Sequence, residues 1–143
     1  MSTDRYILIS AQDAYALLQA NTNAVLVDVR SDMEYLMIGH PVGAVNIPWI
    51  DAPDWVISPE FVARIRKLLL GRVSSAHRSD GVPVVLICRS DNRSRDAAQV
   101  LIDEAALRSV YVIEHGFEGP LDADRKRSTV GGWRKEGLPW EQC

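Results

Sequence analysis

The sequence lacks several features that mark special classes of protein. Its 143 residues contain no run of 18 apolar residues, so no membrane-spanning segment is predicted. The first residues, MSTDRYILISAQD, carry an acid early and lack the apolar core of a signal peptide, so we expect no secretory signal. Only two cysteines are present, Cys88 and Cys143. Two are too few for a disulfide framework, and we expect a protein of the reducing cytoplasm.

The charge, the length and the motif content of the sequence exclude further classes of protein. The net charge of −3 argues against a general binder of nucleic acid or of anionic membranes. No Cys-x-x-Cys or His-Glu-x-x-His spacing occurs, so no metal site is predicted. There is no internal repeat, low-complexity tract or linker. We therefore expect residues 1–143 to form a single domain, with a core over about residues 6–140.

Short apolar segments alternate with segments of helical periodicity. The predicted strands are residues 5–9, 24–29, 44–48, 83–88 and 110–114; the predicted helices begin after Ser10, after Ser31, at Ser58-Pro59-Glu60 and near Arg93. Ser10 with Asp13 and Ser31 with Glu34 have the spacing of a capping box, and Pro59 is expected at a first helical position. Residues 74–81 are predicted as a loop, and 131–140 as loops and short turns. The alternation predicts an α/β fold, a mostly parallel sheet of about five strands with helices on both faces.

In such sheets, functional sites lie beyond the carboxyl ends of the strands. Cys88 ends one predicted strand, while Asp28 and Arg30 end another. We therefore expect these three residues to share one edge of the sheet. For Asp28 and Arg30, an ion pair that holds loops together is as good an interpretation as contact with a substrate.

The segment CRSDNRS, residues 88–94, has the composition of a reactive thiol site. A turn from strand to helix directs free backbone N–H groups, together with the helix dipole, toward an anion such as the Cys88 sulfur. Two guanidiniums, Arg89 and Arg93, within roughly 6 Å would each favour the thiolate by up to about 3 kcal/mol at an effective dielectric near 20. We therefore expect a lowered thiol pKa. Asp91 would oppose this effect if it faced the sulfur, so we expect it to point outward. Asp91-Asn92 can turn the loop in left-handed conformations without glycine.

The same segment resembles the active-site loop of rhodanese-like sulfurtransferases, commonly Cys-Arg-x-Gly-x-Arg-Ser/Thr. Asp91 replaces the usual glycine. Three further segments, LVDVRSDMEYLMIGHPVGAVNIPW (26–49), VYVIEHGFEGP (110–120) and GGWRKEGLPW (131–140), are similar to segments of the family in the same order. The resemblance implies a rhodanese-like three-layer fold.

It also implies an activity. Cys88 would be the nucleophile and would carry a sulfane sulfur as a persulfide, taken from an anionic donor such as thiosulfate and passed to cyanide or a thiol. Arg89 and Arg93 would hold the donor and stabilise the leaving sulfite. The loop amides, including those of Ser90, Asp91, Asn92 and Ser94, would surround the sulfur. No metal or organic cofactor is implied. The implied partners are a small-molecule sulfur donor and a thiol, cyanide or protein acceptor, with no nucleic acid and no membrane.

Two other functions remain open at this point. Related phosphatases and arsenate reductases use a cysteine followed by five residues and an arginine, whereas four residues separate Cys88 from Arg93. A rhodanese-like domain can also act as a sulfur relay or regulatory binding module that does not turn over free thiosulfate. A cysteine–histidine pair is a further alternative, involving His40, His77 or His115. The basic cluster in residues 122–129 is either solvated or a docking site for an acceptor, and we assign no role to Cys143.

Overall fold

A computed structural model describes residues 5–72 and 81–142 of the chain. The elements follow the order β1 (Ile7–Ile9), α1 (Ala11–Ala20), β2 (Val25–Asp28), η1 (Glu34–Ile38), β3 (His40–Pro41), β4 (Val45–Asn46), β5 (Ile50–Asp51), β6 (Val56–Ile57), α2 (Phe61–Leu70), β7 (Val84–Ile87), α3 (Asn92–Ala105), β8 (Val110–Ile113) and β9 (Trp140–Glu141). The predicted loop at 74–81 falls outside the described residues except for Gly81, as do His77 and Cys143.

Five strands form one parallel sheet in the order β1-β8-β7-β2-β4, which confirms the predicted α/β architecture. Every residue of β2 and β7 is buried, as their continuous apolar patterns predict. Strand β7 lies at the centre, and its register places Ile87 beside Asp28 of β2. The residues that follow β2 and β7 therefore leave the sheet at the same edge.

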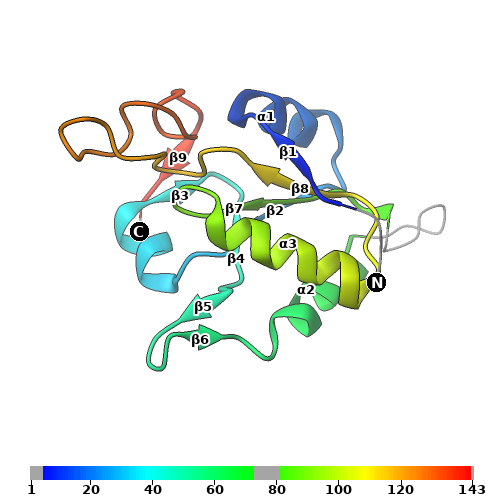
Figure 1. The fold of residues 1–143 in the computed structure, drawn as a ribbon. Coiled ribbons are helices and arrows are strands. Elements are labelled where there is room, and N and C mark those ends of the chain that lie inside the picture. Colours follow the sequence, from blue (N-terminus) through cyan, green and yellow to red (C-terminus); the bar gives the residue numbers. More distant parts are fainter. Residues whose placement is uncertain (1–4, 73–80, 143) are drawn as a thin grey trace.

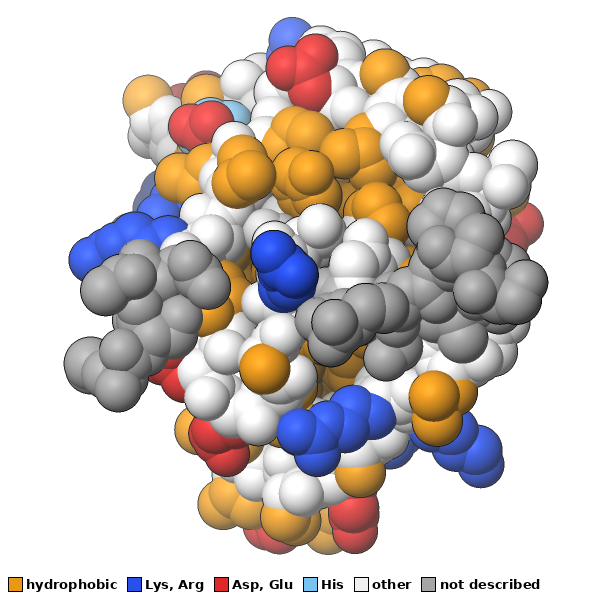
Figure 2. Space-filling model, turned by 90° about the vertical axis from the view of Figure 1, so that its right-hand side faces the viewer, with side chains coloured by type: hydrophobic (Ala, Val, Ile, Leu, Met, Phe, Trp, Pro, Cys, Tyr) orange, Lys and Arg blue, Asp and Glu red, His pale blue; other side chains and the backbone are white. Residues whose placement is uncertain are grey.

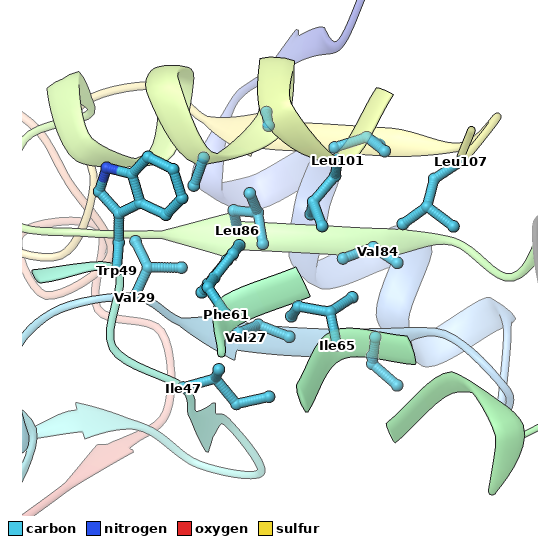
Figure 3. Packing of buried hydrophobic residues seen from close by; sticks show 14 of the residues in the cluster. Val27, Val29, Ile47, Trp49, Phe61, Ile65, Val84, Leu86, Leu101 and Leu107 are labelled. Carbon is cyan, nitrogen blue, oxygen red and sulfur yellow. The ribbon is translucent and has the colours of Figure 1, made fainter. Parts of the chain in front are cut away.

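Helices cover both faces of the sheet, as Figure 1 shows. On one face, α2 and α3 pack against alternate sheet residues such as Val84 and Leu86, and Figure 3 shows this layer. On the other face, α1 packs with Phe117 and Trp133 against Val85 and Ile87. The alternation along β7 thus gives each face its own apolar core. Figure 2 shows the end of the molecule at which the sheet strands begin, where cationic side chains are scattered among other types.

Several local features differ from the prediction. The second long helix begins at Phe61, so Pro59 precedes the helix instead of occupying its first position. The segment after Ser31 is a single turn of π-helix, η1, a rare form that recurs at functional sites. Two small antiparallel pairs, β5 with β6 and β3 with β9, were not predicted because each strand has only two residues. Among the described helices, none has both the length and the hydropathy needed to cross a bilayer.

Candidate active site

Cys88 follows β7 directly, and its side chain is 1% exposed. The backbone N–H of Ser94, in the first turn of α3, donates a hydrogen bond of 3.4 Å to Cys88 Sγ. The Ser94 hydroxyl is also buried and has no hydrogen-bond partner among the described residues. The sulfur therefore lies between the end of the sheet and the amino end of a helix, as predicted. Its 1% exposure means that the sulfur is sealed from bulk solvent.

The loop backbone is fixed from the other side by the segment that follows β8. The Phe117 N–H donates to the Cys88 carbonyl at 2.8 Å, and the Glu118 N–H donates to the Arg89 carbonyl at 3.0 Å. Gly116 has φ +59°, and a Cβ there would lie 2.3 Å from the Cys88 carbonyl oxygen. Only glycine fits this contact without a shift of the backbone. The Gly-Phe-Glu-Gly sequence at 116–119 thus holds the cysteine loop in place.

The two predicted guanidiniums have different surroundings. Arg89 is exposed. Arg93 is partly buried and makes a bidentate ion pair with Glu34, with Nη1 to Oε1 at 2.7 Å and Nη2 to Oε2 at 2.9 Å. Burial raises the pKa of the Cys88 thiol, and the charge of Arg93 is close enough to oppose that rise. Arg93 is therefore the guanidinium whose effect on the sulfur is evident in the resting site.

Glu34 is held both by Ser31, which precedes η1, and by Arg93 of α3. Both the backbone N–H and the hydroxyl of Ser31 donate to its Oε1, at 3.2 and 2.9 Å, and the Glu34 N–H donates to Ser31 Oγ, which completes the predicted capping box. Burial raises the pKa of Glu34, but the hydrogen bonds and charge of Arg93 and the hydrogen bonds of Ser31 outweigh it and lower that pKa from 4.5 to about 2. The carboxylate is thus a fixed negative charge beside the cysteine loop.

Asp28 and Arg30 form a second pair at the same edge, and both side chains are fully buried. Arg30 Nη2 donates to Asp28 Oδ2 at 2.6 Å and also to the Gly39 carbonyl at 2.6 Å, while its guanidinium lies 4.6 Å from the centre of the Phe117 ring. The side chain of Asn46 donates to the carbonyls of Asp28 and Arg30, both at 3.0 Å. This network joins β2, β4 and the turn before β3, so the loop-holding interpretation of the pair fits its contacts.

Comparison with known proteins agrees with this arrangement. The chain matches the model of the rhodanese-like domain over residues 10–122. It belongs to the rhodanese-like domain family.

The alignments with similar proteins cover nearly the whole of this rhodanese-like chain. RP600, an uncharacterized protein of Rickettsia prowazekii (strain Madrid E), is 30% identical over 139 residues, which cover 93% of this chain and 95% of the relative. The crystal structure of Rv0390 from M. tuberculosis has a TM-score of 0.79 at 35% identity, and the match covers 98% of this chain and 100% of that one. The polysulfide-sulfur transferase of Wolinella succinogenes has a TM-score of 0.57 at 25% identity, with 96% of this chain and 80% of that one covered.

The departure from the family's loop pattern, Asp91, takes a different position from the one predicted. Its carboxylate accepts from Arg95 Nε at 3.0 Å and from the His115 N–H at 3.3 Å, and its side chain is 17% exposed, so it does not point into solvent. Its φ of 171° is extended, and Asn92 is the first residue of α3. The prediction of left-handed residues at Asp91-Asn92 is therefore wrong. The aspartate stabilises the loop by pairing with α3 and with the segment after β8.

The expected lowering of the thiol pKa is also wrong for the resting site. Burial raises the pKa of Cys88 above its ordinary value. The Ser94 hydroxyl, which lies near the sulfur without the geometry of a full hydrogen bond, opposes this effect, as do the amides of Ser94 and Arg93 and the charge of Arg93. The loop amides and Arg93 were predicted to act in this way, whereas the Ser94 hydroxyl was not, and Arg89 is not among the groups that act on the thiol; together the opposing groups do not outweigh the loss of solvent. A buried thiol keeps its proton unless charge compensation is larger than here.

Two contributions to the site were missed. Glu34 was assigned only to a helix cap, and its ion pair with Arg93, 59 residues away, has no signal in local spacing. The Ser94 side chain was overlooked because only the loop amides were considered. Of the two histidines in the described part of the chain, His40 stacks on Tyr35 with ring centroids 3.7 Å apart, and the His115 side chain is half exposed; neither makes a hydrogen bond to the Cys88 thiol. Ser90 and the amides of residues 89–92 remain predicted members of the site.

Proposed function

We propose that this rhodanese-like protein is a sulfurtransferase that carries a sulfane sulfur on Cys88 as a persulfide. The observation that carries the proposal is the pair of donors beside Sγ: the Ser94 amide at 3.4 Å and the buried Ser94 hydroxyl, which has no hydrogen-bond partner in the described part of the chain. A buried hydroxyl without a partner costs free energy of about 1–3 kcal/mol. A second, anionic sulfur on Cys88 would accept from such donors and remove that cost. The likeness to a polysulfide-sulfur transferase supports the same chemistry.

The reaction is a pair of displacements at sulfur. In the first, the Cys88 thiol loses its proton to solvent, and the resulting thiolate attacks the outer sulfur of an anionic donor such as thiosulfate. The sulfur–sulfur bond of the donor breaks, sulfite leaves with the bonding electrons, and the sulfur remains as Cys88–S–S⁻. In the second, a thiophilic acceptor such as cyanide or a thiolate attacks that outer sulfur and regenerates the Cys88 thiolate. Arg93 lies where it can stabilise negative charge at the sulfur, and the exposed Arg89 can attract an anionic donor.

Intact-mass spectrometry tests the proposal directly. The protein is incubated with thiosulfate, methanethiosulfonate or polysulfide, and its mass is measured before and after addition of cyanide. We expect one added sulfur atom, lost to cyanide as thiocyanate. Cys88→Ser should abolish the addition completely, whereas Cys143→Ser, the matched control for the other thiol, should not change it. Absence of added sulfur with all three donors would reject the proposal, and a parallel assay of phosphate-ester hydrolysis would show whether the loop serves a phosphatase instead.

A further inference from the structure

Most of the positive charge around the cysteine loop is already compensated. Three arginines lie within seven residues of Cys88. Arg93 is paired with Glu34, and Arg95 is paired with Asp91. Only Arg89 has no carboxylate within 4 Å among the described residues, and it is exposed. The loop therefore has much less net positive charge than its three arginines suggest.

The Glu34–Arg93 pair is fixed rather than transient. Glu34 accepts from two Ser31 groups in addition to both Nη atoms of Arg93, and the two side chains are only 20% and 24% exposed. A second carboxylate, Asp28 of β2, is also near enough to raise the pKa of Arg93. The charged and titratable groups near Arg93 are thus Glu34 in η1, Asp28 in β2 and Cys88, which follows β7. Its remaining N–H groups can still donate to a donor molecule, but its charge is largely cancelled.

We propose that Glu34 is a specificity-determining residue that cancels the charge of Arg93 and makes the Cys88 site favour monoanionic sulfur donors over dianionic ones. This inference rests on the proposed sulfur transfer and narrows its substrate class. The favoured donors are thiosulfonates and organic persulfides, which carry one negative charge. Thiosulfate carries two negative charges, so a site with one uncompensated arginine binds it less well than a site with two would.

The transfer step balances with a monoanionic donor. The Cys88 thiolate attacks the outer sulfur of methanethiosulfonate, and the donor's sulfur–sulfur bond breaks. Methanesulfinate leaves with the bonding electron pair, and Cys88–S–S⁻ forms. Two negative charges are present before and after the step, and no oxidant or reductant is consumed. Thiosulfate reacts in the same way but releases sulfite, so the two donors differ mainly in one unit of charge.

The experiment compares kcat/KM for thiosulfate and for methanethiosulfonate in the wild type and three variants. Glu34→Gln removes the charge, and we expect the thiosulfate-to-methanethiosulfonate ratio to rise about tenfold. Glu34→Asp keeps the charge but shortens the side chain, and should leave the ratio within about twofold of wild type. Asp103→Asn removes an exposed charge about 15 Å farther along α3 and should not change the ratio. An unchanged ratio in Glu34→Gln, or equal shifts in Glu34→Gln and Glu34→Asp, would overturn the inference.

A second measurement does not need sulfur transfer. Sulfate and methanesulfonate are unreactive tetrahedral anions with two charges and one, and each can protect Cys88 from alkylation by iodoacetamide. Protection by sulfate should strengthen about tenfold in Glu34→Gln, while protection by methanesulfonate should change much less. If no donor transfers sulfur but this difference appears, the proposed function fails and the charge selectivity stands. If sulfur is transferred and neither protection changes, Glu34 has only a structural role.

Discussion

Two carboxylate–guanidinium pairs lie at the same edge of the sheet and differ in almost every physical respect. Asp28–Arg30 joins residues two apart, is fully buried and forms part of a network with Gly39 and Asn46. Glu34–Arg93 joins residues 59 apart and is about one fifth exposed. The first holds β2 and the turns after it in one arrangement. The second sets the charge next to the Cys88 sulfur.

The difference follows from solvent access. A fully buried pair cannot lose one partner without leaving a charge in a medium of low dielectric, so it is suited to fixing a structure. A partly exposed pair contributes less to stability because water and salt screen part of its charge. Such a pair can therefore be altered at a smaller cost in free energy than the buried pair. The same two functional groups, a carboxylate and a guanidinium, thus stabilise the fold in Asp28–Arg30 and adjust the charge beside Cys88 in Glu34–Arg93.

Breaking the buried pair should have the largest effect. Asp28→Asn leaves Arg30 buried, with one Nη already lacking a hydrogen-bond partner among the described residues. We expect the free energy of unfolding to fall by about 3–5 kcal/mol, measured by urea denaturation. The double variant Asp28→Asn with Arg30→Met removes the stranded charge and should be less destabilised than Asp28→Asn alone. A loss under about 1 kcal/mol in the single variant would contradict the framework role.

The two pairs also show how far the sequence could lead. Parallel strands end at a common edge, so the apolar segments 24–29 and 83–88 were sufficient to bring Asp28, Arg30 and Cys88 together. The spacing of Ser31 and Glu34 was sufficient to predict the capping box. Neither pattern predicts that Glu34 pairs with Arg93, because that contact depends on how η1 packs against α3. The raised pKa of Cys88 was not predicted either, because its direction depends on the balance between burial and the groups that oppose it, and that balance is set by the folded structure.

The partly exposed pair should give an intermediate effect with a distinctive pH dependence. The folded state holds the pKa of Glu34 at about 2, below its ordinary 4.5. A carboxyl whose pKa is lowered in the folded state adds stability above its unfolded pKa, and this is lost as the pH falls from about 5 toward 2. Glu34→Gln should therefore cost about 1–2 kcal/mol at pH 7 and progressively less below pH 5, by urea denaturation at each pH. A difference from wild type that is constant from pH 7 to pH 3 would contradict the assignment.

Replacing the exposed Arg89 should have the smallest effect on stability, because this arginine, unlike Arg30 and Arg93, is not part of a carboxylate pair among the described residues. It has no carboxylate partner among the described residues, and Arg89→Gln should change the free energy of unfolding by less than about 0.5 kcal/mol. Its influence on an anionic donor acts through water, so the variant should raise KM in low salt and converge with wild type near 1 M salt, where the Debye length is about 3 Å. Arg93→Gln, with its charge partly buried, should remain impaired under the same conditions. If the higher KM of Arg89→Gln persists at high salt, Arg89 contacts the donor directly, as is expected of Arg93.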